Sequence, residues 1–530
     1  MQFDTHDQLV LVALLAAMAA LLVAAPIFRV PYPIFLVVGG LALGFVPGIP
    51  ALELPPEVVL VAVLPPLLYL SAYFTSLRDL RTNVREISLL SIGLVVATMC
   101  VVAVVAHEAI GNLSWTAAFV LGAIVSPTDP IAATAIARRL GVPRRIVTVI
   151  EGESLVNDGT ALVLYRVAVT AVVAGSFSFW DASWRFAWSV VGGIGVGLVV
   201  GFVVAEVRRR LDNPPVEVTI ALMTGYFAFI PANAIEASGV LAVVTAGIYL
   251  GWRTPELTSV QTRLQGTAVW GILTFILNAL LFALVGLQLS RILDELTGRS
   301  AGRLAWYALL VTGAVVLTRI VWVPIFTYLP RWLSRRVRER DPSPPLSDPI
   351  VISWSGMRGA VSLAAALALP LTTDAGTGFP ERDLIIFLTF CVILGTLVVQ
   401  GLSLPVLIRG LKIEGDHLDE KENAKARIKA ADAAVARLEE LLEEDWVRED
   451  TAERLRGLYR FRRDRFASRF DAADDGAIEE RSLNYQRLRR ELLDAERAEI
   501  VALRREGVIS DAIMHRLQRD LDLEDARLDV

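Results

Sequence analysis

Three polar residues lie on one face of a predicted helix within a long apolar stretch. Ser154, Asn157 and Asp158 stand at positions i, i+3 and i+4, so their side chains project from the same side of an α-helix. Residues 161–174 are apolar apart from Arg166, which places Asp158 within a membrane span. A carboxylate at that depth is costly and commonly marks an ion pathway. Together with a hydroxyl and an amide it forms an all-oxygen site, which suits a hard cation.

A second polar segment, Ser126–Pro130, interrupts an earlier apolar stretch. Pro127 and Pro130 lack a backbone N–H and disfavour helical geometry in the residue before each ring. We therefore expect the helix to break here and to free the backbone carbonyls of residues 125–128. Irregular backbone is tolerated at membrane depth where it lines a wet cavity or binds an ion, as in secondary transporters. The alternative is a simple proline kink in which Asp129 caps the half-helix that follows.

A third polar segment places an arginine between two glycines. Gly356 and Gly359 flank Arg358, and their missing side chains allow a neighbouring helix to approach closely. A buried arginine needs a carboxylate or carbonyls, and we expect Glu153 to be the partner of Arg358 in a structural ion pair. Arg319 is the second candidate for pairing with Glu153.

The composition is typical of a polytopic membrane protein. Hydrophobic residues form 54% of the 530 residues, and apolar runs recur up to about residue 410. These runs predict an all-α fold with about thirteen transmembrane helices, centred near residues 18, 40, 66, 97, 126, 160, 197, 223, 243, 276, 317, 362 and 395. The two cysteines, Cys100 and Cys391, lie in apolar runs, so we expect no disulfide. The net charge of −5 indicates no nucleic-acid partner.

The distribution of arginines predicts the orientation. With thirteen spans taken in order, loops on one side of the membrane hold eighteen arginines and loops on the other side hold five. The smaller set is Arg185, Arg291, Arg299, Arg303 and Arg382. Because cytoplasmic loops are enriched in basic residues, the arginine-rich side is expected to be cytoplasmic. The N-terminus then faces outward from a cell membrane, and everything after Gly410 is cytoplasmic.

The end of the chain has a different composition. Residues 411–530 are dense in charged residues, and leucines recur between them at helical spacing: Leu438, Leu441, Leu442, Leu455, Leu458, Leu488, Leu492 and Leu493. We expect a transmembrane domain over residues 1–410 and a cytoplasmic helical tail over residues 411–530. The amphipathic helices of the tail would pack on one another or on a second subunit. A solvated tail without a ligand is the simpler interpretation, and a regulatory or dimer-supporting module is the alternative.

Five segments resemble the sodium/proton exchanger family of cation/proton antiporters, in particular its bacterial members. They follow the family's order between residues 30 and 410, namely Leu64–Tyr69, Ser126–Pro130, Glu151–Asp158, Ser238–Val243 and Gly356–Ser362. The ordered set is far more specific than any one segment. The resemblance implies two inverted six-helix repeats, a homodimer, and unwound fifth and twelfth helices that cross in the middle of the membrane.

The resemblance also implies an ion site and a function. The site would consist of one main carboxylate, two further Na+ ligands and four residues that hold them in place: Asp158; Ser154 and the backbone of Thr128; and Asp129, Asn157, Glu153 and Arg358. The expected function is exchange of Na+ for H+ by alternating access, which serves pH and sodium homeostasis. No cofactor is expected beyond the transported ions.

Two positions leave the ion and the stoichiometry open, and two other classes of protein fit less well. Some prokaryotic relatives have an acidic residue where this chain has Leu70, so a further ligand is missing and exchange of K+ or Li+ is an alternative to Na+. Asn157 stands where electrogenic relatives carry a second aspartate, which predicts electroneutral exchange.

A cation channel would need a selectivity filter or charged rings. An intramembrane enzyme would need a paired aspartate dyad or a Ser–His pair, and the sequence resembles neither.

Overall fold

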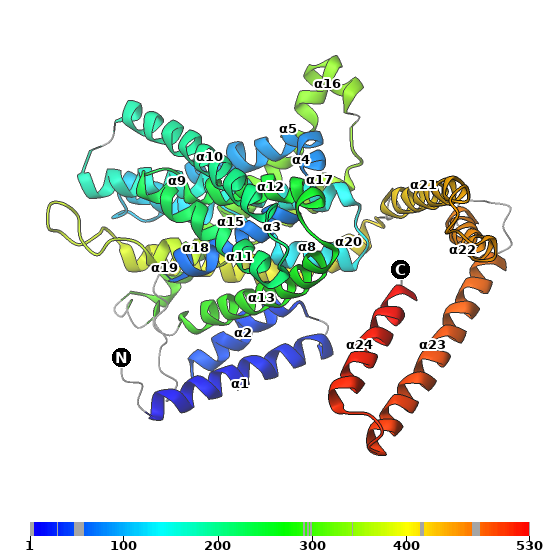
Figure 1. Cartoon of the computed structure of the whole chain (residues 1–530). Coiled ribbons are helices and arrows are strands. Elements are labelled where there is room, and N and C mark those ends of the chain that lie inside the picture. Colours follow the sequence, from blue (N-terminus) through cyan, green and yellow to red (C-terminus); the bar gives the residue numbers. More distant parts are fainter. Residues whose placement is uncertain are drawn as a thin grey trace. The chain divides into compact units, whose positions relative to one another are not determined.

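The computed structural model describes residues 5–28, 30–46, 58–176, 178–289, 292–293, 296, 299–341, 343–413, 418–468 and 477–528. Every regular element in these ranges is a helix, so the prediction of an all-helical fold is confirmed (Figure 1). The chain divides into two compact units, Met1–Gly415 and Asp416–Val530. Arg291, one of the arginines on which the orientation depends, lies outside the described residues.

Unit 1 contains the apolar helices. They are α1 (Thr5–Ile27), α2 (Tyr32–Gly44), η1 (Val58–Val63), α3 (Leu64–Phe74), α4 (Leu77–Thr82), α5 (Val84–Ser88), η2 (Leu89–Leu94), α6 (Val95–Ala109), α7 (Trp115–Val125), α8 (Ile131–Arg139), α9 (Arg144–Ala174), α10 (Phe179–Arg208), α11 (Pro214–Ala234), α12 (Gly239–Leu257), α13 (Val260–Leu287), α15 (Ala301–Leu333), α16 (Arg335–Arg340), α17 (Ser347–Trp354), α18 (Ala360–Leu367), α19 (Arg382–Gly395), η3 (Thr396–Gln400) and α20 (Gly401–Gly410), where η denotes a π-helical turn. Seven stretches of the described chain are long and apolar enough to cross a membrane: Val84–Ala109, α9, α10, α11, α13, α15 and Arg382–Gly410. The multi-pass class is supported by these helices, whereas the count of thirteen spans and the inverted repeats stay predictions.

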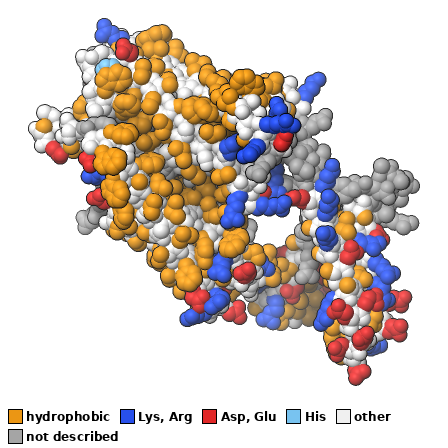
Figure 2. All heavy atoms as spheres, turned by 90° about the horizontal axis from the view of Figure 1, so that it is seen from above, with side chains coloured by type: hydrophobic (Ala, Val, Ile, Leu, Met, Phe, Trp, Pro, Cys, Tyr) orange, Lys and Arg blue, Asp and Glu red, His pale blue; other side chains and the backbone are white. Residues whose placement is uncertain are grey.

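The outer surface of unit 1 is apolar. Figure 2 shows hydrophobic side chains over much of its visible face. On α10, for example, Val191 is 67% exposed, Val199 63% and Phe202 59%. A water-soluble protein rarely exposes a continuous apolar surface of this kind, whereas a lipid bilayer is its natural solvent.

Two apolar helices are interrupted at mid-length. The first ends with α7 at Val125 and resumes with α8 at Ile131, so the predicted break at residues 126–130 is confirmed. The second ends with α17 at Trp354 and resumes with α18 at Ala360. Each break therefore leaves backbone without regular helical hydrogen bonds in the interior of the bundle.

Glycines allow neighbouring helices to pack with their backbones in contact. A Cβ at Gly40 of α2 would overlap the carbonyl oxygen of Ala283 in α13, and a Cβ at Gly286 would overlap the carbonyl oxygen of Val37. A Cβ at Gly251 of α12 would likewise overlap backbone of α3. Small residues promote this close packing in membranes, where the surrounding lipid is as apolar as the helices.

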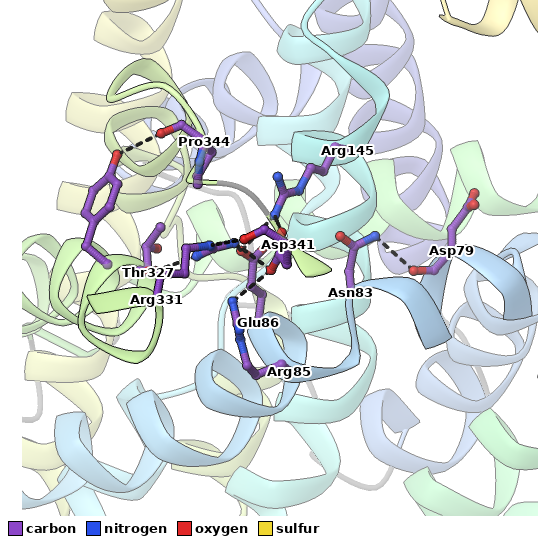
Figure 3. Close-up of polar contacts among 10 residues, drawn as sticks. Asp79, Asn83, Arg85, Glu86, Arg145, Thr327, Arg331, Asp341 and Pro344 are labelled. Atoms are coloured by element: carbon purple, nitrogen blue, oxygen red, sulfur yellow. Dashed lines mark hydrogen bonds and ion pairs between the residues drawn. The ribbon is translucent and has the colours of Figure 1, made fainter. Parts of the chain in front are cut away.

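A charged cluster joins the arginine-rich ends of three helices (Figure 3). Arg331 of α15 is 2% exposed and contacts Glu86 of α5 at 2.6 Å and Asp341 at 2.7 Å. Arg145 of α9 contacts the same two carboxylates at 2.9 and 3.3 Å, and Arg85 contacts Asp341 at 2.8 Å. Shared carboxylates thus connect segments that are far apart in the sequence.

In its described residues, unit 2 forms four charged helices, α21 (Leu418–Leu441), α22 (Glu449–Ser468), α23 (Ala477–Arg505) and α24 (Asp511–Leu528). Arg456 of α22 pairs with Glu439 of α21 at 2.8 Å, and Arg497 of α23 pairs with Asp525 of α24 at 2.9 Å. Of the leucines at helical spacing, Leu493 is fully buried. The predicted helical character of this part of the chain is confirmed.

We expect a chain that ends at Gly415 to insert, to fold as unit 1 and to keep the exchange activity that the resemblance implies, with an altered rate or pH response. Leu411 and Ile413 pack against the core of unit 1, so a cut after Gly410 should cost more stability than a cut after Gly415. Thermal unfolding and transport by the two purified truncated chains, compared with the full chain, measure both effects. Loss of all activity in a well-inserted chain ending at Gly415 would contradict the prediction.

Candidate ion-binding site

The two helix interruptions lie against each other. The backbone N–H of Asp129 donates a hydrogen bond to the carbonyl of Met357, with 2.8 Å between the two atoms. Gly359 has no room for a side chain, because a Cβ there would overlap the Asp129 carboxylate. Asp129 Oδ1 also accepts the N–H of Ile131, the first residue of α8, at 2.9 Å. The close approach expected at Gly359 is confirmed, and the Asp129 carboxylate binds the first backbone N–H of the half-helix that follows it.

Asp158 and Ser154 project from α9 into a cavity of about 430 Å³. Thr128 and Asp129 line the same cavity, so the structure brings these four predicted site residues together. Asp158 is 7% exposed and Ser154 6%, and both lie deep within the helical bundle. Two carboxylates and two hydroxyls offer oxygen ligands in a cavity, which is the donor set that a small hard cation prefers.

The cavity runs toward the arginine-rich end of the helices. Its wall there includes Ser71, Phe74 and Thr75 at the end of α3. It also includes Arg138 and Glu151, which form an ion pair of 2.6 Å in which the Arg138 side chain is 67% exposed. The cavity therefore reaches the surface at this end.

Asn157 holds the first interruption rather than lining the cavity. Its Nδ2 donates to Thr128 Oγ1 at 2.7 Å, and Thr128 Oγ1 donates to Glu153 Oε1 at 3.1 Å. Asn157 is fully buried, and its Oδ1 has no hydrogen-bond partner among the described residues. The three polar residues predicted on one face of α9 thus have different surroundings, because Ser154 and Asp158 line the cavity while Asn157 contacts the broken segment.

Glu153 pairs with Arg319, and the predicted pair of Glu153 with Arg358 is wrong. Arg319 Nη1 donates to Glu153 Oε1, and Arg319 Nη2 donates to Oε2 at 2.7 Å. Arg319 Nε and Nη2 also donate to the carbonyl of Ile352 at 3.0 and 2.9 Å. The arginine fits over Gly356, where a Cβ would overlap it. Arg319 therefore provides the bidentate partner of Glu153, and Oε1 of the same carboxylate also accepts the hydroxyl of Thr128.

Arg358 uses a backbone carbonyl instead. Its Nη1 donates to the carbonyl of Ser126, and its backbone N–H donates to Thr396 Oγ1 at 3.1 Å. Arg358 is 1% exposed, and its Nε and Nη2 have no hydrogen-bond partner in the part of the chain that the structure describes. The predicted free carbonyl at residues 125–128 is confirmed at Ser126. The Arg358 guanidinium, and not a cation, binds this carbonyl oxygen.

Further polar residues of the cavity wall escaped the sequence analysis. Thr274 and Asn278 of α13 and Ser362 of α18 line the cavity. Asn278 Oδ1 and Ser362 Oγ are buried without hydrogen-bond partners within the described ranges. Asn278 stands in the apolar run of residues 268–287, which is the same kind of signal that singled out Asp158. Leu70, the position at which the resemblance raised the possibility of a further ligand, also lines the cavity.

Arg166 belongs to a separate contact. Its Nη2 donates to Asn233 Oδ1 at 2.8 Å, and its Nη1 donates to the carbonyl of Ala237 at 3.4 Å. These acceptors lie at the end of α11 and in the turn after it, which accounts for a charged side chain within an apolar stretch of α9.

The structure is a bundle of apolar helices in which two helices are broken beside a cavity lined by carboxylates. These features define a multi-pass membrane transport protein. Residues 10–410 match the family model described as sodium/hydrogen exchanger, transmembrane, and the chain belongs to this family. The family indicated by the sequence motifs is therefore confirmed.

Individual proteins extend the comparison. The Uncharacterized Na(+)/H(+) exchanger Rv2287 of Mycobacterium tuberculosis is 40% identical over 525 residues, which cover 98% of this chain and 96% of the relative. The Sodium, potassium, lithium and rubidium/H(+) antiporter of Bacillus subtilis is 35% identical over 389 residues, 71% of this chain and 58% of the relative. The solved structure of the sodium proton antiporter MjNhaP1 from Methanocaldococcus jannaschii at pH 8 matches with a TM-score of 0.61 at 19% identity, covering 77% of this chain and 99% of that chain. This last likeness shows a shared fold.

Glu153 and Arg319 should behave as a coupled pair in a double-mutant cycle, in which each single replacement causes a large loss of stability. Glu153→Gln or Arg319→Gln leaves a buried charge without its partner, which typically costs about 3–5 kcal/mol. The double variant removes both charges, so its loss should be smaller than the sum of the two single losses. Thermal unfolding of the four purified proteins measures the difference.

The matched control is a second double-mutant cycle, in which Glu153 is combined with Arg358 in place of Arg319. Glu153→Gln and Arg358→Gln remove buried charges that attract each other but form no hydrogen bond, so their coupling should be clearly weaker than that between Glu153 and Arg319. Additive losses for Glu153 and Arg319, with coupling between Glu153 and Arg358, would reverse the assignment.

Proposed function

We propose that this protein exchanges Na+ for H+ across a cell membrane, with Asp158 as the carboxylate that binds either ion. The observation that carries the proposal is the shared cavity, in which Asp158, Ser154 and Thr128 lie at the crossing of two broken helices. Oxygen ligands from these residues suit Na+ without requiring a rigid geometry. When the cation leaves, the same carboxylate can take up a proton, because the two ions favour opposite protonation states. One site that holds one ion or the other couples the two flows in opposite directions.

The neighbouring residues keep this site in shape. Asp129 holds the start of α8 and the crossing, and Asn157 holds Thr128 through its side-chain amide. Glu153 and Arg319 fix α9 against the second broken segment.

Alternating access is the proposed transport cycle. The cavity reaches the surface at the arginine-rich end, beside Arg138 and Glu151, and basic residues favour the cytoplasmic side. We take this arrangement as the inward-facing state, in which the ion site exchanges with the cytoplasm. Transport then requires a second arrangement in which the site faces outward, with the broken segments moving as part of one helical group.

Na+ is the proposed substrate cation, and K+ is the alternative. Several relatives carry names that specify Na+, whereas the Bacillus subtilis relative is named for sodium, potassium, lithium and rubidium. Leu70 removes a possible carboxylate from the cavity wall, and fewer charged ligands discriminate less strongly among monovalent ions. K+/H+ exchange is therefore the alternative. Dissipation of a pH gradient in proteoliposomes, measured with Na+, Li+ and K+ in turn, separates the two.

The proposed cellular arrangement follows from the same features. We place the protein in a cell membrane as a homodimer of thirteen-helix subunits built from two inverted repeats, with the N-terminus outside and residues 411–530 in the cytoplasm. The apolar exposed surface supports membrane insertion, and the arginine-rich ends of the helices support the orientation. The charged helices of unit 2 support a location in water.

Asp158→Asn should abolish exchange while the protein still inserts and folds. An amide has a similar shape but cannot take up the exchanged proton, so coupling is lost. Cation-dependent proton movement in proteoliposomes measures activity, and thermal unfolding verifies the fold. Asp181→Asn, which removes an exposed carboxylate at the start of α10, is the control and should retain exchange. Exchange that persists in purified Asp158→Asn protein would refute the assigned role.

Exchange should be electroneutral. Asn157 stands in place of a second carboxylate, and the Asp129 carboxylate is engaged by the backbone N–H of Ile131. We therefore expect Asp158 alone to release about one proton for each cation bound, so no net charge crosses the membrane. The transport rate should then be insensitive to membrane potential, which acts on a moved charge with about 2.3 kcal/mol per 100 mV. Proteoliposomes clamped with K+ and valinomycin, with Na+ as the test ion, measure this dependence. A transport current, or a rate that changes steeply with the imposed potential, would show that more than one proton moves per cation.

A further inference from the structure

A second, smaller cavity lies among the ends of five helices, apart from Asp158. It has a volume of about 120 Å³ and is lined by residues of α3, α10, α11, α12 and α13. This space is enough for several water molecules or one compact polar group, since a water molecule takes up about 30 Å³ of liquid. The lining includes Arg208 and Arg263 together with hydroxyl groups of the α12 and α13 ends.

Arg208 is a buried cation with unsatisfied donors. It is the last residue of α10 and is 2% exposed, yet its Nε and Nη1 have no hydrogen-bond partner in the described part of the chain. The nearest carboxylate, Glu217, lies 4.0 Å from Nη2, which is too long for a hydrogen bond. Glu217 Oε1 accepts the hydroxyl of Thr262 at 3.2 Å, and Glu217 Oε2 is buried without a hydrogen-bond partner among the described residues. Buried donors without partners are costly, so the geometry leaves a place for an acceptor.

The charges around the cavity favour an anion. Arg208 and Arg263 contribute two positive charges to the lining, and the adjacent Glu217 contributes one negative charge. The helix ends at the cavity do not decide the sign, because α11 and α13 begin here with partial positive charge whereas α3, α10 and α12 end here with partial negative charge. One singly charged anion would balance the set.

The cavity opens toward the surface of unit 1. Phe74, Arg263 and Thr267 belong to its lining and are all exposed, and the Phe74 side chain is 57% exposed. An arginine beside an exposed aromatic ring is typical of the level at which lipid head groups meet a membrane protein.

We propose that this cavity binds a phosphate group through Arg208 and Arg263. The group can come from the head group of an anionic phospholipid or from free inorganic phosphate, and the chemistry is the same in both cases. This cavity would bind a different ligand from the cavity that contains Asp158, although Phe74 lines both cavities. The inference therefore does not rest on the proposed exchange of Na+ for H+.

The test compares two arginines at the same end of α10. Purified full-length protein is titrated in neutral detergent with phosphatidylglycerol or with inorganic phosphate, and the shift in thermal unfolding gives an apparent Kd for each. Arg208→Gln should weaken binding by about tenfold or more, because charge-assisted hydrogen bonds are lost. Arg209→Gln, which removes an exposed arginine paired with Glu206, should leave binding nearly unchanged.

The two probes separate the sources of the phosphate. Binding of phosphatidylglycerol alone assigns the site to a lipid head group, and binding of both probes assigns it to phosphate in general. If Arg208→Gln does not fold, Arg263→Gln at the exposed mouth takes its place with the same expectation. Equal binding by the wild type and the folded cavity variant, or no binding of either probe by the wild type, would overturn the proposal.

Discussion

The bidentate contact between Arg319 and Glu153 is the interaction on which the geometry of the candidate ion site depends. Both groups are buried in an apolar bundle, where each charge would be costly alone. The same guanidinium donates to the carbonyl of Ile352 just before the second broken segment, and the same carboxylate accepts the hydroxyl of Thr128 in the first. One ion pair therefore ties both interruptions to α9, the helix that carries Asp158. Without it, the two segments of irregular backbone would lose their common support.

Missing side chains are as important to this arrangement as the charges. Gly356 makes room for Arg319, and Gly359 makes room for the Asp129 carboxylate. The resulting crossing is close enough for the direct backbone hydrogen bond between Asp129 and Met357. Close backbone approach, a buried ion pair and a polar cavity thus occur at one place, because each needs the space or the hydrogen bonds that the others supply.

The sequence predicted what is decided locally. Pro127 and Pro130 remove backbone hydrogen bonds wherever the chain lies, so the break was predictable, and Asp158 stood out because carboxylates are rare in apolar spans. The partner of Glu153 was not predictable, because Arg319 and Arg358 are both long and the choice depends on how helices distant in sequence are rotated. The direction of Asn157 was missed for the same reason, since spacing along a helix does not say which neighbour an amide will meet. Asn278 was overlooked although its apolar surroundings carried the same signal as those of Asp158.

The buried charges around the crossing have a consequence for ions of higher valence. Asp158, Asp129 and Glu153 bring three negative charges to this region, and Arg319 and Arg358 bring two positive ones. A single monovalent occupant brings that sum to zero. A divalent ion such as Ca2+ or Mg2+ would leave one surplus positive charge in an apolar environment, in addition to the large cost of removing its hydration shell. In the proposed site, the fixed charge of Arg358 would therefore disfavour the binding of divalent cations.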